Sequence, residues 1–573
     1  MKHSNQKKAN PNVLTRTKTN TPRNAFDMSH DVYMHSPVGM IVPSFVQDIK
    51  PNDYFTLDVS SYARTVPVNT AAFCRMTEYT DFYFVPMKQI WQPFEQMENP
   101  VPDVRSALSL ASQKSNTVSS MPYFTWLQLR TMLASQDAGG ADKDLMFNVR
   151  PKAYATRLLD MLGYFSNPHK PFVPDADNND DVWISQMNTY FAESQHFNPY
   201  RILAFNRILN DYYRQTDYVA GDARLFNIDD IESGAQLPDE RLRAIFRCLF
   251  TTDDQYETNC IFPFVKWNLD KLTATKPSQL YGSFVNPTNV NGNTTVDFQL
   301  NNPSGGVNTY YPTIPDGYSN TQDLRIAQAL EKIARVSMSA PKTFKAQQEA
   351  HFGVSSESCD SCSIRYLGSY RSDLEIGEVI ATSNYDSEAA SNYLGQVAGK
   401  GVCAGHKNGV VKMHSKDFGV IIGVHYVKPE AEYQMNRLNP LVTRFGRSDF
   451  FVPEFDQLGL EPCYQGEYVA GSAANWTVIG YRSRYSNLKS RVSEVHGNFQ
   501  KDRNLASWAM ARNHLDFQAI DRSLYRFYVD PRVSDTIFEH NFDGTEVTDQ
   551  FICHYLYKAT LVSDMSINGI PTL

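Results

Sequence analysis

Residues 550–562 read QFICHYLYKATLV. Apolar side chains occupy every second position, opposite polar ones: Phe551, Cys553, Tyr555 and Tyr557 against His554 and Lys558. A period of two is typical of a strand with one face buried, because successive side chains point to opposite faces of a sheet. This stretch therefore predicts a half-buried β-strand near the end of the chain.

Similar strand patterns recur toward both ends of the sequence. Residues 78–85 (EYTDFYFV) are aromatic and β-branched, and residues 418–427 (FGVIIGVHYV) form a nearly continuous apolar run. Residues 476–482 follow the same pattern, as do residues 54–59 after a turn at residues 51–53. Aromatic and β-branched runs bounded by turn residues favour strands.

Helical periodicity lies mainly between these β regions. Residues 199–213 (PYRILAFNRILNDYY) and 323–336 (DLRIAQALEKIARV) each place apolar side chains on one helical face. Strands at both ends with helices and loops between them predict one β-sandwich with long connections, in which the first and last strands can share a sheet.

Composition indicates a large folded chain. Its 573 residues are 42% hydrophobic and 20% charged, and 54 Lys+Arg against 62 Asp+Glu give a net charge of −8. This excludes a disordered protein and a wholly basic DNA-binding surface. The early cations have no apolar run behind them, and residues 418–424 are far shorter than the roughly 18 residues of a bilayer span. We therefore expect no cleaved export signal and no membrane insertion.

Motifs of catalysis and metal binding are missing or incomplete. The sequence has no P-loop, GxSxG or HExxH pattern. Gly399, Gly401 and Gly405 miss the dinucleotide spacing by one residue, so we predict a flexible loop there. The acidic residues 175–181 lack the turn glycine and the bidentate Glu of a calcium loop, and this favours a solvated segment. We expect buried thiols rather than a zinc ribbon, because the single CxxC pair, Cys359 and Cys362, has no second pair.

The first 25 residues carry cations and no carboxylate, mixed with Asn, Thr and Pro, which predicts a flexible basic arm. Such an arm can reach nucleic-acid phosphates, and a solvated tail without a function is the alternative. The candidate nucleic-acid contacts are Lys2, Lys7, Lys8, Arg16, Lys18 and Arg23.

Residues 283–320 are rich in Asn, Gly, Pro and Thr and form a long, turn-rich connection. Loops of this length are usually functional or mobile. We therefore predict a surface protrusion that meets a host, against the alternative of a loop with no partner. The candidate residues are Asn291, Gly292, Asn301, Asn302, Gly305, Tyr310 and Tyr311.

Many blocks, taken in order, resemble the major capsid proteins of the Microviridae, the small single-stranded DNA phages. The resemblance covers roughly residues 26–573, although the basic arm is long and the 283–320 loop has no counterpart. The blocks are 26–30 (FDMSH), Val42-Pro43, 67–72 (PVNTAA), 81–86 (DFYFVP), 198–218 (NPYRILAFNRILNDYYRQTDY), 267–273 (WNLDKLT), 323–333, 351–354 (HFGV), 419–423, 447–455 (RSDFFVPEF), 481–497 and Trp508.

The resemblance implies a mainly β fold: an eight-stranded antiparallel jelly-roll β-barrel of the viral capsid type with long helix- and loop-containing insertions. Residues 26–573 would form this single domain behind the arm at 1–25. The insertions would lie at about 100–270 and 321–350, beside the variable loop at 283–320.

The resemblance also implies a structural protein with no enzymatic activity and no cofactor. Sixty copies would form a T=1 icosahedral shell around a circular single-stranded DNA genome, built in the bacterial cytoplasm and found in the virion. Its expected partners are a scaffolding protein, a pilot protein, in some members a small basic DNA-binding protein, and a host-cell receptor. A β-rich carbohydrate-active enzyme and a surface lectin or adhesin remain the alternatives.

Overall fold

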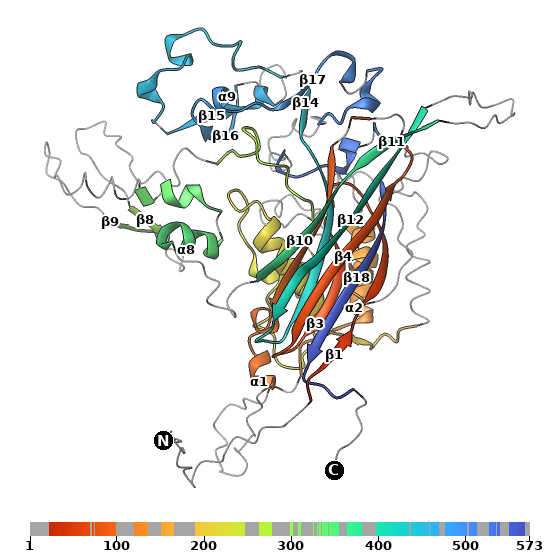
Figure 1. Ribbon diagram of the computed structural model, residues 1–573. Helices are drawn as coiled ribbons and strands as arrows, with labels where there is room; N and C mark the ends of the chain where they lie inside the picture. The colour runs from red at the N-terminus through yellow and green to blue at the C-terminus, as the bar shows by residue number, and fades with distance from the viewer. Residues whose placement is uncertain are drawn as a thin grey trace, which may run out of the picture.

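The computed structural model describes part of the 573-residue chain. The described residues are 22–68, 72–73, 75–98, 118, 120–135, 151–164, 190–246, 263–277, 298–301, 307–310, 325, 329, 332–333, 335–341, 343–353, 364–380, 397–434, 437–457, 459–468, 476–500, 503–512, 526–534, 536–538 and 549–567. This part is mainly β, with several antiparallel sheets, as the sequence predicted (Figure 1).

The larger sheet is antiparallel and is built around the strand quoted first from the sequence. That strand is β18 (Phe551–Ser563), and its buried and exposed positions alternate as predicted. It pairs with β4 (Tyr54–Thr65) along one edge, and with β1 (Asn24–Asp27) and β2 (His30–Ser36) along the other. β12 (Val397–His414) and β11 (Glu375–Ile380) complete the sheet beyond β4. The first and last described strands are therefore neighbours.

The second sheet is also antiparallel, in the order β10-β5-β13-β3. These strands are β10 (Arg365–Asp373), β5 (Met76–Pro86), β13 (Gly419–Pro429) and β3 (Val42–Ile49). β13 is buried at nearly every position, because the other sheet covers one of its faces and helices cover the other. This explains why its sequence is continuously apolar rather than alternating.

Three glycines predicted as a flexible loop lie instead within strand β12, so that prediction is wrong. A Cβ on Gly405 would stand 2.2 Å from Tyr370 Oη, and one on Gly401 would stand 2.7 Å from the Thr65 side chain. Glycine in a strand interior often marks close approach of a neighbouring group. Gly401 and Gly405 therefore permit packing, and Gly399 pairs with β11.

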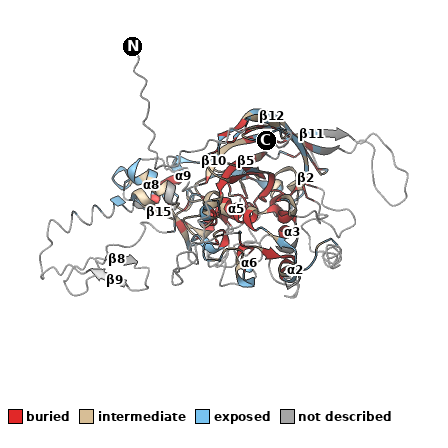
Figure 2. Cartoon of the chain, turned by 90° about the horizontal axis from the view of Figure 1, so that it is seen from below, coloured by how far each residue is buried: buried red, intermediate tan, exposed pale blue. Residues whose placement is uncertain are grey.

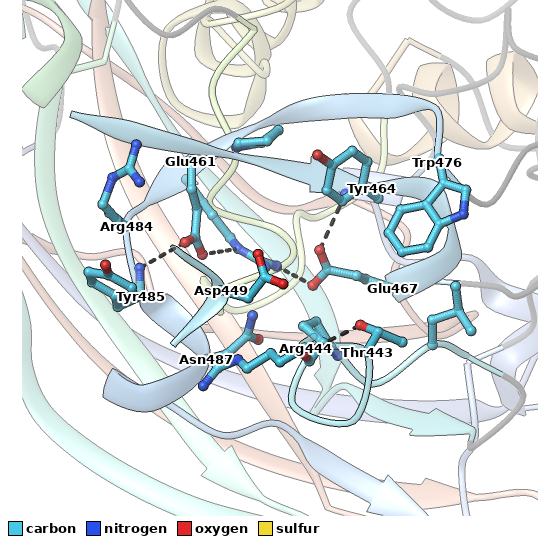
Figure 3. A pocket seen from close by; sticks show the side chains of 14 residues that line it. Thr443, Arg444, Asp449, Glu461, Tyr464, Glu467, Trp476, Arg484, Tyr485 and Asn487 are labelled. Carbon is cyan, nitrogen blue, oxygen red and sulfur yellow. Dashed lines mark hydrogen bonds and ion pairs between the residues drawn. The ribbon is translucent and has the colours of Figure 1, made fainter. Parts of the chain in front are cut away.

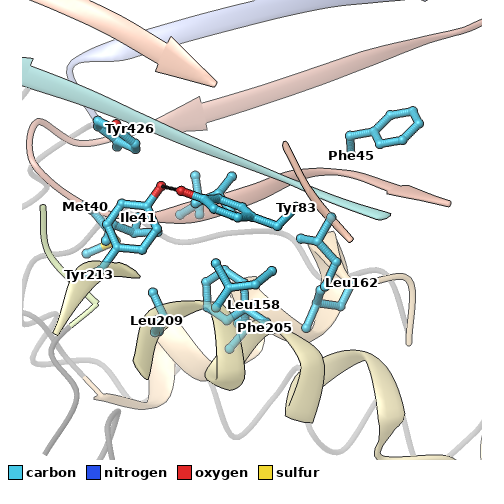
Figure 4. Close-up of a cluster of buried hydrophobic side chains, with 14 of the residues drawn as sticks. Met40, Ile41, Phe45, Tyr83, Leu158, Leu162, Phe205, Leu209, Tyr213 and Tyr426 are labelled. Carbon is cyan, nitrogen blue, oxygen red and sulfur yellow. Dashed lines mark hydrogen bonds between the residues drawn. The ribbon is translucent and has the colours of Figure 1, made fainter. Parts of the chain in front are cut away.

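The outer face of the second sheet is covered by helices. α5 (Tyr200–Ile208) continues into a π-helical turn at Leu209–Tyr213, which confirms the helix predicted for this region. Leu158, from α3 (Pro151–Met161), and Phe205, from α5, lie beside Tyr83 of β5 (Figure 4). Figure 2 shows that α3 and α5 contain buried segments and lie next to the strands, with α2 (Trp126–Ser135) and α6 (Asp239–Ile245) farther out.

A smaller unit of short elements lies at one end of the sandwich (Figure 1). We call residues 432–495 the surface unit. It contains β14 (Glu432–Gln434), β15 (Leu460–Tyr464), β16 (Val478–Ser483), α9 (Ser486–Lys489) and β17 (Ser493–Val495). Arg512 ties it to the body, because its guanidinium donates to Tyr433 Oη at 3.0 Å and lies 4.6 Å from the Trp267 ring. Strand β16 confirms the prediction for residues 476–482.

The remaining strands and α-helices are short. They are α1 (Phe94–Glu98), β6 (Phe124–Thr125), β7 (His196–Phe197), β8 (Phe298–Asn301), β9 (Val307–Tyr310) and α8 (Phe344–Phe352). The described residues of the predicted helix at 323–336 are helical. The 3-10 turns span Met87–Gln89, Ala223–Leu225, Arg447–Asp449, Pro453–Phe455, Gln465–Glu467, Gly497–Phe499, Ala506–Trp508 and Pro531–Ser534. Within the described ranges, no helix is long and apolar enough to cross a bilayer.

Candidate functional site

Of the six predicted nucleic-acid contacts, only Arg23 is described. Its Nη2 donates to Asn52 O at 2.9 Å, and its Nη1 lies 3.8 Å from Asp564 Oδ1. Arg23 thus holds the start of β1 against the adjacent chain segments. The predicted contacts Lys2, Lys7, Lys8, Arg16 and Lys18 lie outside the described residues.

Two of the predicted host-facing residues are described. Asn301 ends β8 and Tyr310 ends β9, and these two strands pair as an antiparallel ladder. The other five lie outside the described residues: Asn291, Gly292, Asn302, Gly305 and Tyr311. The acidic residues 175–181 and the Cys359 and Cys362 pair also lie outside them. Cys403, Cys463 and Cys553 form no disulfide and are buried, as expected of thiols that pack as small hydrophobes.

The sequence did not predict a polar cluster between the two sheets. We call it the core cluster: Glu78, His425 and Tyr555, with the hydroxyls around them. Tyr555 Oη contacts Glu78 Oε1 and lies 2.7 Å from His425 Nδ1. Ser61 Oγ donates to Glu78 Oε2 at 3.0 Å, and His425 Nε2 lies 2.9 Å from Ser36 Oγ. Both Glu78 and His425 are completely buried.

Burial favours the neutral forms of Glu78 and His425. Loss of solvent raises the pKa of Glu78 to about 7, although the hydrogen bonds from Tyr555 and Ser61 oppose this shift. Burial also lowers the pKa of His425 to about 3. Tyr555 Oη donates to Glu78 Oε1, and neutral His425 can donate its Nδ1–H to Tyr555 Oη. His425 Nε2 then accepts from Ser36 Oγ, so one chain of hydrogen bonds links the members of the cluster.

A second buried carboxylate, Asp81, lies on the other face of β5, toward the helices. Tyr426 Oη donates to its Oδ2 at 2.8 Å, and Tyr213 Oη donates at 3.0 Å. Burial raises the pKa of Asp81, and the tyrosine hydrogen bonds work against this rise. Each acid of β5 is thus held by tyrosines away from bulk water.

Glu78, His425 and Cys553 are also the one group of metal-ligand types that the described residues bring together, with ligand atoms within 4.8 Å of one another. A metal needs a carboxylate, a thiolate and a free imidazole nitrogen. Here both His425 nitrogens are already hydrogen-bonded, and burial raises the pKa of the Cys553 thiol well above its usual range. The donor set therefore fits a hydrogen-bond network better than a metal centre.

The surface unit contains an open cavity of about 360 Å³ (Figure 3). At its base, Arg482 Nε donates to Glu461 Oε1 at 3.1 Å and Arg482 Nη1 lies 2.7 Å from Glu467 Oε2. Burial lowers the pKa of Arg482, but Cys463, Glu467 and Glu461 outweigh burial and the net shift is upward. Glu461 also accepts from Tyr485 N and Ser486 Oγ. A cation and hydrogen bonds therefore fix both carboxylates in place.

Three aromatic side chains are among the mainly polar residues that line this cavity. Tyr464 and Trp476 stand on one side, with their rings 5.4 Å apart, and Tyr485 stands on the other, 5.0 Å from Phe451 (Figure 3). Trp476 is 62% exposed and Phe451 is 51% exposed. Large exposed apolar surfaces on folded proteins mark interaction sites.

The described part of the chain is a two-sheet β-sandwich with an apolar core around a small polar cluster, and its surface unit carries exposed aromatic side chains. These features fit a protein that acts through its surfaces. A family model described as "Capsid protein (F protein)" matches residues 15–110 and 186–573. The chain therefore belongs to this family of Microviridae capsid proteins, as its sequence blocks predicted. It is the major capsid protein of a small single-stranded DNA phage and a component of the virion.

Two relatives agree with the family assignment. The chain is 22% identical to the capsid protein VP1 of Chlamydia phage 1, over 96% of each chain. It is 24% identical to the capsid protein VP1 of Bdellovibrio phage phiMH2K, over 43% of this chain and 45% of the relative. As a member of a structural capsid family the chain is not an enzyme, and the carbohydrate-active, lectin and adhesin alternatives are set aside.

Proposed function

We propose that this capsid subunit is an eight-stranded jelly roll that forms a T=1 shell of 60 copies around a circular single-stranded DNA genome. One observation carries the fold proposal. Numbered one to eight along the chain, the strands β2, β3, β4, β5, β10, β12, β13 and β18 follow the orders 1-8-3-6 and 2-7-4-5 in the two sheets. Two interleaved Greek keys produce these orders, which supports the jelly-roll proposal.

Particle formation tests the shell proposal. The full chain should be expressed alone and together with the genes encoded beside it, and its products viewed by electron microscopy. Uniform icosahedral particles with 60 copies by mass are the expected result. A different copy number would reject the T=1 shell, and soluble monomers under every condition would reject assembly by this chain and its helpers.

Genome contact is the second part of the proposal, and the basic arm is its candidate. The five cations before Arg23 have no neighbouring carboxylate, whereas Arg23 is held by Asn52 and Asp564. The affinity for single-stranded DNA falls with salt, and the slope of log affinity against log salt concentration measures how many cations take part. Deleting residues 1–21 should therefore make this slope shallower by about 0.7 × 5, or roughly 3.5. An unchanged slope and an unchanged DNA content of the particles would remove the arm from genome binding.

Host attachment is the third part, and residues 283–320 are its candidate. They are polar and turn-rich and interrupt two family-like blocks. Exchanging this loop between related phages should transfer host range, and an unaltered host range would reject it as a recognition element.

The other expected partners, a scaffolding protein, a pilot protein and a small basic DNA-binding protein, should copurify with assembly intermediates or virions if they act on this subunit.

A further inference from the structure

The surface unit has an unusual concentration of exposed apolar side chains. Among the described residues between positions 442 and 488, six large hydrophobic ones are more than half exposed: Val442, Phe445, Phe450, Phe451, Trp476 and Leu488. Phe445 is the extreme case at 89%. We call these six residues the apolar patch. Leaving several large rings in water is unfavourable, and about 1.5–3 kcal/mol is gained for each such side chain that becomes fully buried.

The charged residues around the apolar patch have the composition of an interface. Residues 429–488 contain five Arg and no Lys, although Lys residues directly flank the segment at 428 and 489. Arg437 and Arg482 are buried in ion pairs, so Arg444, Arg447 and Arg484 are the cations nearer the surface. Arginine and aromatic residues are enriched in protein interfaces and lysine is depleted, because a guanidinium is more weakly hydrated than an ammonium group. Acidic residues occur in the same segment, so the surface carries both signs of charge and can complement another copy of itself.

The cavity beside the apolar patch has polar atoms that nothing in the described structure satisfies. Asn487 is 9% exposed and its Oδ1 accepts no hydrogen bond from the described residues, and the buried Nε of Arg484 likewise donates none there. Both residues border the cavity (Figure 3). One site thus offers an acceptor, a donor and aromatic side chains. A backbone segment with an apolar side chain supplies the matching N–H, C=O and hydrocarbon surface.

We propose that the apolar patch and its cavity form a subunit–subunit contact of the shell, with a second copy of this chain as the occupant and Phe445 as the anchor. The inference rests on the proposed function, because a shell of identical copies must bury matching surfaces on every subunit. The closed sandwich interior provides no such surface, whereas the surface unit lies at one end of the sandwich. Interface hot spots are often aromatic rings that are fully desolvated in the complex. Phe445 is an aromatic ring that is almost fully exposed in the free subunit, so it would lose its solvent only on binding.

The test compares two identical substitutions at exposed phenylalanines. Phe445→Ser lies in the apolar patch, and Phe352→Ser, at the end of α8, lies outside it and is 78% exposed. Under conditions in which the unaltered chain forms particles, Phe445→Ser should raise the subunit concentration needed for half-assembly at least tenfold. Phe352→Ser should leave it within about twofold. Equal assembly by both variants, or equal loss, would overturn the anchor role of Phe445.

Amide hydrogen exchange on the unaltered chain decides the matter even if Phe445→Ser fails to fold. Amides in residues 441–451 and 476–488 should exchange at least tenfold more slowly in particles of this chain alone than in free subunits. Equal exchange in well-formed particles would overturn the contact and leave the shell proposal intact. Protection that appears only when another phage protein is present would also overturn it, since the occupant would not be a second copy. Absence of particles altogether would instead count against the shell.

Discussion

The core cluster and the base of the cavity in the surface unit both bury carboxylates, but they neutralise them in opposite ways. Glu78 has no guanidinium or ammonium partner among the described residues, and burial raises its pKa to about 7. Glu467 is similarly buried, yet it lies 2.7 Å from the guanidinium of Arg482. A buried carboxyl group can bind a proton or pair with a cation. The first solution makes stability depend on pH, and the second makes it depend on one side chain.

Arg482→Met should have the largest effect, because it leaves Glu461 and Glu467 without their shared cation. Breaking a buried ion pair by removing one partner costs about 3–5 kcal/mol. The free energy of unfolding of the isolated subunit, measured in urea, should fall by this amount, and protease cleavage within residues 432–495 should accelerate.

The matched control for this change is the triple variant Arg482→Met, Glu461→Gln, Glu467→Gln. It should recover most of the lost stability, because no uncompensated charge remains in the cavity base. If the single variant loses less than about 1 kcal/mol, or the triple variant recovers nothing, the ion pairs do not hold this region together.

Glu78→Gln tests the opposite solution through pH. The ordinary pKa of Glu78 is 4.5 and its pKa in the folded subunit is about 7. Between these two pH values the folded subunit binds more protons than the unfolded chain. The contribution of Glu78 to stability therefore falls as pH rises through this window. A shift of this size corresponds to about 3 kcal/mol at most. The stability of Glu78→Gln relative to the unaltered subunit should therefore rise by up to about 3 kcal/mol between pH 4.5 and 8.

The lowered pKa of His425 acts in the opposite direction, since it makes the folded state bind fewer protons between about pH 3 and 6.5. This contribution is present in both proteins and cancels in the comparison. Glu430→Gln, at a half-exposed residue paired with Arg75, is the matched control and should show no comparable rise. A flat difference for Glu78→Gln would mean that Glu78 is charged inside the sandwich.

The contrast also shows how far local sequence predicts this molecule. The alternation in β18 and the apolar run in β13 predict strands because each position's burial depends on its neighbours two residues away. The prediction of a loop in β12 is wrong because two of its glycines, Gly401 and Gly405, make room for Thr65 and Tyr370, which belong to other strands.

The core cluster could not be predicted, because Glu78, His425 and Tyr555 come from three strands far apart in the sequence. The one available signal was a charged residue, Glu78, and a histidine, His425, inside otherwise apolar strand runs. Their meeting depends on the β5–β13 register, which aligns Glu78 with Val427 and Thr80 with His425. Such a long-range register is a property of the whole fold. The cavity depends likewise on the packing of short elements that have no strong periodicity.

Tyr555→Phe should have a moderate effect on the core cluster. The hydroxyl contacts Glu78 and lies 2.7 Å from His425 Nδ1, so its loss leaves two buried groups each short of a partner. A cost of about 1–3 kcal/mol is expected in urea unfolding at pH 6. Tyr557→Phe, which removes one hydroxyl contact with Ser44, is the control and should cost less. A larger loss for Tyr557→Phe would contradict the idea that Tyr555 links the cluster.

Lys489→Ala should have the smallest effect, although it also breaks an ion pair in the surface unit. Lys489 Nζ lies 2.9 Å from Asp456 Oδ1, but the two side chains are 50% and 39% exposed. Water and salt weaken such a pair to less than about 1 kcal/mol. A double-mutant cycle of Lys489→Ala with Asp456→Ala measures the coupling directly, and it should shrink further in 1 M salt, where the Debye length is about 3 Å. A coupling comparable to that lost in Arg482→Met would mean that proximity alone stabilises this unit. A small coupling supports the view that the burial of Arg482, which is 4% exposed, makes its ion pairs strong.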